Sequence, residues 1–195
     1  MDWDWNVQTS YSIADHRNKV LSGDADQNKL RDLFLAGQFD VLAPQGSKSD
    51  VSSAFINPTY RSRGELLTNK VVFAGELFNL GDLYSSGGPV SMAVGTEFQS
   101  ESFEFLNDQA LVDGSSLGRQ TRNFSGNRSV RSAFVEFALY PIETLEVQVA
   151  GRFDSYSDVG ETANPKLAMA YRPIKEVLFR SSVATGFRAP GITDI

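Results

Sequence analysis

The chain has 195 residues, with 18 Lys and Arg against 24 Asp and Glu, and a net charge of −6. This acidic balance argues against a nucleic acid or an anionic membrane surface as partner, because both are bound through clustered positive charge. The sequence contains no cysteine and one histidine, which excludes disulfide frameworks, thiolate metal sites and multi-histidine metal sites. A hydrophobic fraction of 41% is too high for a disordered chain, so the chain is expected to fold.

Hydropathy gives no sign of a membrane helix or a secretory signal. No stretch approaches about 18 uninterrupted apolar residues, and Met1 to Asp4 are acidic where a signal peptide is basic. A membrane-spanning β-strand, however, needs only about 10 residues of alternating polarity, which a hydropathy scan does not detect. The pattern of alternation therefore decides the class of fold.

Alternation with a period of two begins close to the N-terminus, where Trp3, Trp5 and Val7 are separated by Asp4 and Asn6. This pattern predicts a strand with one apolar and one polar face. It recurs six more times along the chain. The predicted strands cover residues 3–13, 69–80, 89–105, 129–140, 144–155, 163–172 and 177–188.

The connections between the predicted strands alternate in length. Short ones lie near Gly81 to Gly88, Pro141 to Glu143 and Pro173 to Lys175, and long ones cover 14–67, 106–128 and 156–162. Bacterial outer-membrane barrels have this asymmetry, with short periplasmic turns and long extracellular loops. We therefore predict an all-β, antiparallel, up-and-down transmembrane β-barrel, present as an incomplete seven-strand segment, with 14–67 and 106–128 as long extracellular loops.

The first long loop holds one predicted helix. Leu30, Leu33, Phe34 and Phe39 recur at helical spacing after the turn-forming run from Ser22 to Asn28. One or two helical turns packed over the barrel mouth are expected.

Motifs that resemble metal or catalytic sites fail on their spacing. The run from Asp24 to Asn28 matches the start of a calcium-binding EF-hand loop, but Lys29 stands where glycine is needed and Leu35 where glutamate is needed. Residues 114–118 fit the G-x-S-x-G pattern of a hydrolase elbow, yet the one histidine, His16, lies upstream instead of downstream. We therefore predict no enzymatic activity, no metal and no cofactor.

From about residue 65 onward the chain resembles the barrel of a TonB-dependent outer-membrane receptor. Two segments, Ala93 to Phe98 and Ala133 to Glu136, support the resemblance, and the order and spacing of the motifs within 146–190 make it specific. Those motifs are Gly151 to Asp154, Tyr156 to Gly160, Asn164 to Lys166, Tyr171 to Pro173, Arg180 and Gly186 to Pro190.

The resemblance implies an architecture, a location and a function. Members of the family are 22-stranded barrels with a plugged lumen, so residues 1–195 are expected to be part of one β-barrel domain, without the plug domain. It implies active uptake of a scarce nutrient, such as a ferric siderophore, cobalamin or a glycan, across the bacterial cell outer membrane. The implied partners are outer-membrane lipid, the protein's own plug domain, the TonB energy-transducing complex and a small-molecule nutrient. A passive porin-like or adhesion barrel and a soluble β-sandwich binding module are the alternatives.

Candidate site residues follow from the predicted strand faces and from the resemblance. On the last strand Val177, Phe179, Val183 and Phe187 form the predicted apolar face. Ligand binding is expected in the loops Asp15 to Thr68 and Asn107 to Arg128. Charged residues on the polar faces are expected to line the lumen, where they contact the plug, guide substrate or pair across strands. They are Glu146, Arg152, Asp154, Lys166, Arg172, Arg180 and Arg188.

Overall fold

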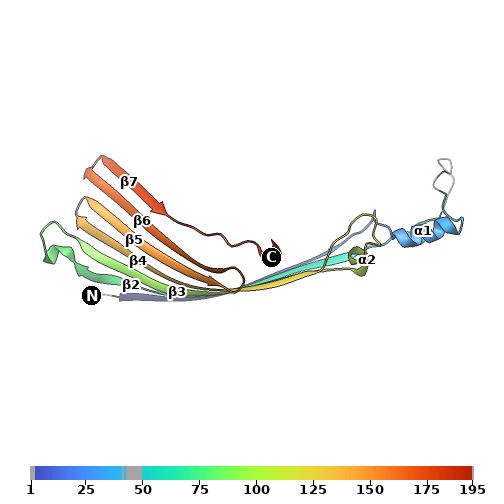
Figure 1. Cartoon of the computed structure of the whole chain (residues 1–195), viewed down its shortest axis with the longest axis horizontal. Helices are drawn as coiled ribbons and strands as arrows, with labels where there is room; N and C mark the ends of the chain where they lie inside the picture. The colour runs from blue at the N-terminus through green and yellow to red at the C-terminus, as the bar shows by residue number, and fades with distance from the viewer. Residues whose placement is uncertain (1–2, 41, 43–49, 195) are drawn as a thin grey trace. The chain divides into compact units, whose positions relative to one another are not determined.

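The computed structural model describes residues 3–40, 42 and 50–194. Within these residues, seven antiparallel strands form one open sheet, in which each strand lies beside its neighbours in the sequence (Figure 1). The strands are β1 (Trp3–Lys19), β2 (Thr59–Asn79), β3 (Pro89–Asn107), β4 (Phe124–Ile142), β5 (Leu145–Tyr156), β6 (Gly160–Ile174) and β7 (Val177–Ala184). The helices are α1 (Gln27–Leu35) and α2 (Gln109–Val112), with 3-10 turns η1 (Ser52–Ala54), η2 (Leu80–Asp82) and η3 (Ile192–Asp194).

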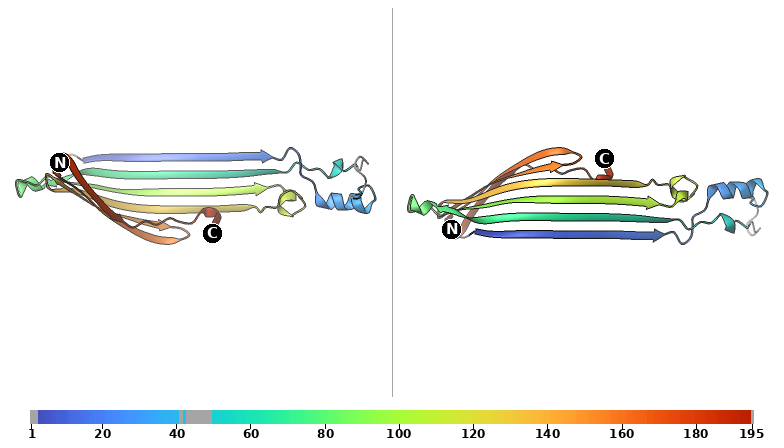
Figure 2. Two further views of the ribbon diagram at one scale, coloured as in Figure 1. Left: turned by 90° about the horizontal axis from the view of Figure 1, so that it is seen from above. Right: turned by 90° about the horizontal axis from the view of Figure 1, so that it is seen from below.

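This topology confirms the predicted all-β, up-and-down class with seven strands. Figure 2 shows β1 to β4 side by side in chain order, with antiparallel neighbours. A β-sandwich needs two sheets packed face to face, whereas the strands of the described residues belong to one sheet. The soluble β-sandwich alternative is therefore wrong.

The chain divides into two compact units. The sheet unit comprises Met1–Ser12, Glu65–Glu101 and Asn127–Ile195, and the loop unit comprises Ile13–Gly64 and Ser102–Gly126. In the sheet unit, Val149 of β5 lies opposite Phe137 of β4 and Leu167 of β6, and Leu167 lies opposite Val183 of β7. The loop unit contains α1, α2 and the ends of β1 to β4 that are continuous with the two long connections.

Strands β1 and β2 are longer than the alternation of apolar residues predicts. β1 continues to Lys19 and β2 begins at Thr59, so both ends of the predicted 14–67 loop are strand. A charged pair supports this extension, because the Arg61 guanidinium donates two hydrogen bonds to the Asp15 carboxylate across the two strands. Cross-strand pairs of opposite charge stabilise a sheet without an apolar side chain. In the same way β3 reaches Asn107 and β4 begins at Phe124, which shortens the predicted 106–128 loop.

Two predictions about the last strands are wrong. The connection predicted to be long at 156–162 is a tight turn, because β5 ends at Tyr156 and β6 begins at Gly160. Gly160 has a φ of +89°, a conformation that glycine adopts without steric cost. β7 ends at Ala184, so Phe187 leaves the predicted apolar face and packs edge-on against Tyr156, with 5.7 Å between ring centroids.

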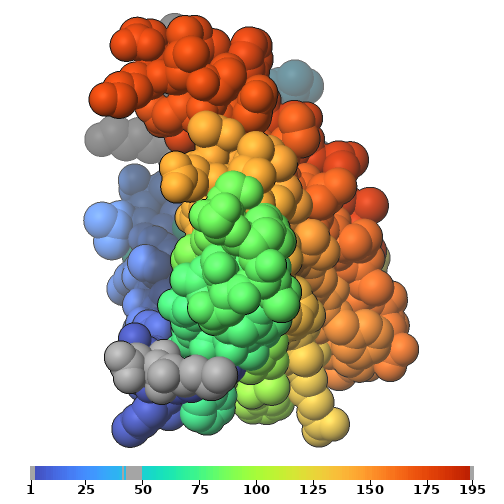
Figure 3. All heavy atoms as spheres, turned by 90° about the vertical axis from the view of Figure 1, so that its left-hand side faces the viewer, coloured from blue at the N-terminus to red at the C-terminus, as the bar shows by residue number. Residues whose placement is uncertain are grey.

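The connections β2–β3, β4–β5 and β6–β7 lie on one rim of the sheet unit, at the strand ends away from the two long connections. Figure 3 shows this rim, with the β2–β3 connection in green and the β6–β7 connection above it in orange. The β4–β5 connection lies between Ile142 and Leu145, and the β6–β7 connection lies between Ile174 and Val177. Both turns are near their predicted places, but Pro141 and Pro173 lie in the ends of β4 and β6 and not in the turns. No helix among the described residues has the length and apolar character required to cross a membrane.

Candidate functional site

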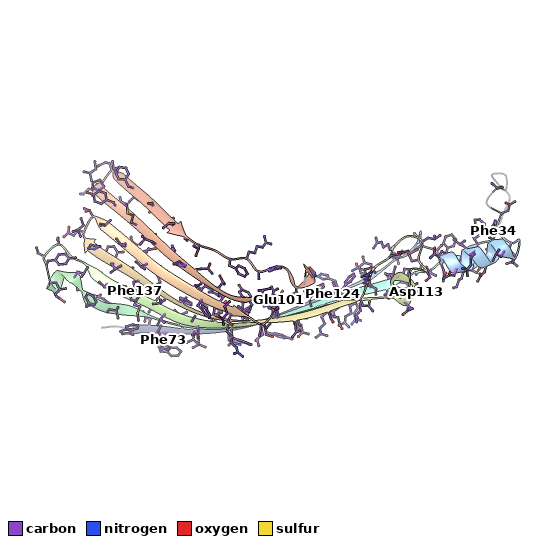
Figure 4. The ribbon with its side chains drawn as sticks, in the orientation of Figure 1. Phe34, Phe73, Glu101, Asp113, Phe124 and Phe137 are labelled. Carbon is purple, nitrogen blue, oxygen red and sulfur yellow. The ribbon has the colours of Figure 1, made fainter. Side chains whose placement is uncertain are left out.

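One face of the sheet unit is apolar and exposed. Val149, Leu167 and Val183 lie in one cross-strand row and expose 44%, 49% and 68% of their surface. Phe73 of β2 is also half-exposed, and Figure 4 shows its side chain below the ribbon in that view. Soluble monomers rarely expose contiguous apolar patches larger than a few hundred Å². An uncovered apolar row across neighbouring strands is typical of a wall that faces lipid.

The apolar face has a defined length along each strand. On β5 it runs from Leu145 to Phe153, and Ser155 follows on the same face. On β3 it runs from Val90 to Phe98, and Ser100 follows on the same face. Each stretch covers about nine residues, which matches the 9–11 residues that a tilted strand needs to cross a bilayer.

The opposite face of the sheet unit carries a charge network centred on Arg152. Its Nε donates to Asp154 at 2.7 Å, and its Nη2 donates to the Ser132 hydroxyl at 2.9 Å and lies 3.4 Å from Glu97 Oε1. Arg152 is half-exposed, whereas the Asp154 and Glu97 side chains are largely buried. The network joins β3, β4 and β5 and satisfies two carboxylates with one guanidinium.

Three further charges predicted for the lumen share this polar face. Glu146 and Arg180 both lie opposite Ala170 of β6, and Lys166 lies opposite Ala184 of β7. Together with polar neighbours they line an open hollow of about 490 Å³ in the sheet unit. The hollow is lined by residues that include Glu146, Gln148, Lys166, Arg180 and Ser182.

Arg172 and Arg188 are not part of this group. Arg172 lies where the β6–β7 register shifts, and its Nη1 donates to the Lys175 carbonyl in the adjacent turn at 3.3 Å. Arg188 lies beyond the end of β7. The assignment of the polar face to a lumen stays a prediction for all seven residues.

A close packing contact on the polar face was not predicted from the sequence. Phe134 of β4 covers Gly95 of β3, where a Cβ would come within 2.5 Å of the Phe134 ring. The ammonium group of Lys70 lies 5.5 Å from the centroid of the same ring. A side chain at position 95 would therefore force the ring or the neighbouring backbone to shift.

The loop unit is held together by Asp24. Its carboxylate accepts hydrogen bonds from the Ser116 hydroxyl at 2.8 and 2.9 Å, from the Gly118 amide at 3.2 Å and from the Ala25 amide at 2.8 Å. Asp24 and Ser116 are buried, with 4% and 2% exposure. Isolated bridges pair Ala25 with Phe55 and Asp26 with Ser116. The two long connections thus fold as one body.

The helix predicted in the first connection is confirmed as α1, but it ends at Leu35, so Phe39 lies outside it. Asp26 caps its N-terminus by accepting hydrogen bonds from the Asn28 amide at 2.9 Å and the Lys29 amide at 3.2 Å. Asp24 and Asp26 therefore have structural partners. The described residues contain no group of three or more His, Cys, Asp or Glu side chains that can hold a metal ion.

Aromatic side chains line one face of the strand ends in the loop unit. The Tyr60 and Phe105 rings lie 6.0 Å apart, and the Phe103 and Phe124 rings lie 6.1 Å apart. The Arg119 guanidinium carbon lies 5.9 Å from the centroid of the Tyr60 ring. All four rings are half-buried, and Figure 4 labels one of them, Phe124. We call the four rings together with Arg119 the aromatic wall.

The aromatic wall was missed from the sequence, because Tyr60 and Phe124 fall in segments that were predicted as loop. The opposite face of the same strand ends carries the charged pair of Asp15 and Arg61. Alternation of the aromatic Tyr60 with the charged Arg61 is the signal that identifies this segment as strand.

Two carboxyl groups of the loop unit stabilise tight turns. The Ser115 amide donates to Asp113 at 2.9 Å, and this bond is the main cause that lowers the pKa of Asp113 below its ordinary value of 3.8. Hydrogen bonds from Ser52 likewise lower the pKa of Asp50. Asp113, which Figure 4 labels, follows α2 directly.

An antiparallel up-and-down sheet with one apolar and one polar face, whose two long connections lie on the same rim, is typical of the wall of a membrane β-barrel. The family described as "TonB dependent receptor-like, beta-barrel" matches residues 1–195, and the chain belongs to this family. No curated protein and no solved structure matches the chain. The family consists of outer-membrane receptors and transporters and not of enzymes, and its full-length members have a plug domain and interact with TonB.

Proposed function

We propose that this chain forms part of the wall of a receptor that actively imports a scarce nutrient through the bacterial outer membrane. The apolar face contacts lipid, and the polar face, with Glu146, Arg152, Asp154, Lys166 and Arg180, borders the plugged lumen. The long connections face the cell exterior and bind the nutrient. A passive porin-like or adhesion barrel is disfavoured by membership in the TonB-dependent family.

The aromatic wall is the observation that supports a substrate class. Paired rings offer flat apolar surfaces to a planar ligand, and Arg119 adds a positive charge beside them. A ferric siderophore with catecholate rings combines flat aromatic rings with negative charge. This chemistry fits the wall better than that of an uncharged glycan, which lacks the negative charge that Arg119 favours.

The substrate class is tested by titrating the intact receptor in detergent with iron(III) tris-catecholate, cyanocobalamin and a maltooligosaccharide, with tryptophan fluorescence as readout. We expect the iron chelate to bind most tightly. Tyr60→Ala and Phe105→Ala should each weaken its binding about tenfold, since a lost aromatic pair contributes roughly 1 kcal/mol or more. Phe73→Ala, which removes a half-exposed ring from the apolar face of β2, is the control and should leave binding unchanged.

Two results would contradict the proposal. Tighter binding of cyanocobalamin or the oligosaccharide would make the substrate class wrong, and unchanged binding in both wall variants would exclude the wall as the site. Active import is tested separately by measuring uptake of radioactive iron in cells with and without TonB. Equal uptake in both strains would favour a passive barrel.

A further inference from the structure

Asp24 in the first long connection is joined to the aromatic wall by a short chain of hydrogen bonds. The Ser116 hydroxyl donates to the Asp24 carboxylate at 2.8 Å, and the Ser116 oxygen accepts from the Arg119 amide at 3.1 Å. The Arg119 guanidinium then lies over the Tyr60 ring. A residue 92 positions before Ser116 in the sequence thus fixes the backbone that carries Arg119.

Burial makes this connection rigid. Asp24 and Ser116 are almost completely buried, so water does not compete for their hydrogen bonds. A carboxylate acceptor strengthens the hydrogen bonds that it accepts from Ser116 and Gly118, because charge-assisted hydrogen bonds are roughly twice as strong as neutral ones. At Gly118 a Cβ would lie 3.2 Å from Asp24 Oδ1, so the missing side chain allows the Gly118 amide to approach the same carboxylate.

We propose that Asp24 is a positioning residue for ligand binding, which holds Arg119 against Tyr60 through the Ser116 hydroxyl. The first connection thereby sets the geometry of a binding surface that lies on β2, β3, the second connection and the start of β4. Asp24 itself is buried, so it does not reach the ligand. This inference rests on the proposed function, because it assigns Arg119 to the nutrient site.

The sequence supplies a matched control one residue away. Ser115 is also buried, at 7% exposure, but its hydroxyl lies 3.4 Å from the Ala110 carbonyl, and it also forms a hydrogen bond with Asp113. Ser115→Ala and Ser116→Ala therefore remove the same group from equally buried sites. The second substitution alone breaks the connection between Asp24 and Arg119.

The first experiment measures the position of the second connection without any ligand. In the intact receptor, a nitroxide is attached to the cysteine of Gln120→Cys. Residues 1–195 contain no other cysteine. Asp24→Ala and Ser116→Ala should make the nitroxide more mobile and so narrow the lines of its electron paramagnetic resonance spectrum. Ser115→Ala should leave the line widths unchanged. Asp24→Asn retains one carbonyl acceptor and should give an intermediate spectrum. Equal spectra for Ser115→Ala and Ser116→Ala would overturn the proposal.

The second experiment is a double-mutant cycle on binding of iron(III) tris-catecholate to the intact receptor. Arg119→Ala should weaken binding about tenfold, and Asp24→Ala should cause a similar loss. In the Arg119→Ala background, Asp24→Ala should add less than about twofold, because its effect passes through Arg119. Circular dichroism confirms that each variant is folded.

The outcomes separate the two proposals. An additive loss in the cycle means that Asp24 stabilises the receptor in general, and it overturns the positioning role. If wild-type receptor does not bind the chelate, the substrate class fails, and the label at Gln120 alone decides whether Asp24 fixes the second connection. If Tyr60→Ala weakens binding but Arg119→Ala does not, the wall is retained as the site and the role of Asp24 is overturned.

Discussion

Phe134 lies directly over Gly95 on the polar face of the sheet unit, so close that a Cβ at position 95 would come within 2.5 Å of the ring. An added methyl group has no free space, since the Val71 carbonyl oxygen would lie only 2.7 Å away. The ring and the backbone therefore have to move apart to accept it. The contact fixes the separation of β3 and β4 at this point.

We expect Gly95→Ala to lower the free energy of unfolding of the intact barrel by about 1–3 kcal/mol, the usual cost of overpacking. Gly151→Ala on β5 is the control, because a Cβ there meets no atom within 4 Å. Urea unfolding in lipid vesicles, monitored by tryptophan fluorescence, compares the two variants. Equal stabilities would mean that Phe134 moves away from Gly95 without cost.

Two neighbouring residues of β5, Gln148 and Val149, point to opposite faces and test which face of the sheet contacts lipid. Val149→Arg should destabilise the barrel folded in bilayers by about 2–4 kcal/mol, whereas Gln148→Arg should have a much smaller effect. Val149→Trp distinguishes lipid from a protein core, because lipid accommodates the larger ring and a packed core does not. If Val149→Trp is as damaging as Val149→Arg, the row of Val149 faces protein.

The orientation of the barrel is tested by labelling single cysteines on intact cells with a membrane-impermeant maleimide. Leu117→Cys lies in the second long connection at an exposed position and should be labelled. Glu143→Cys lies in the short β4–β5 turn and should be labelled only after the outer membrane is opened. Labelling of Glu143→Cys on intact cells would invert the orientation.

Acid should loosen the turn that follows α2. The Ser115 amide lowers the pKa of Asp113, so the ionised carboxylate is favoured in the folded state. The resulting stabilisation is complete above the unfolded pKa of about 3.9 and is lost as the pH falls through the lower folded pKa. We expect hydrogen-exchange protection of the Ser115 amide to fall as the pH drops below about 4. In Asp113→Asn this decrease should be absent, and a persistent decrease would assign the effect to another group.

Strand prediction succeeded where an apolar row marks one face. Residues 144–155 were predicted as strand and β5 covers Leu145–Tyr156. It failed for the ends of β1 and β2, because charged residues such as Asp15 and Arg61 carry the pairing there and no apolar row marks one face. These ends hold part of the aromatic wall, so the same error concealed the candidate site.

The buried contact between Asp24 and Ser116 shows a different limit of sequence reasoning. Asp24 was considered as a calcium ligand because of its neighbours, and Ser116 as a catalytic serine because of its flanking glycines. Their actual partners are each other, 92 positions apart. Local motifs do not encode such a pairing, because it depends on how two long connections fold together.

The neighbour-by-neighbour order of the sheet also determines how the chain can assemble. Closing a loop costs more entropy as the loop lengthens. The three hairpins from β4 to β7, whose connections lie between Ile142 and Leu145, Tyr156 and Gly160, and Ile174 and Val177, are therefore the easiest nuclei. β1, separated from β2 by the connection from Lys19 to Thr59, is the hardest strand to add. Pulse-labelling hydrogen exchange during folding into vesicles should therefore protect β5 and β6 before β1. Assembly from the C-terminal hairpins toward β1 leaves the binding connections to be ordered last.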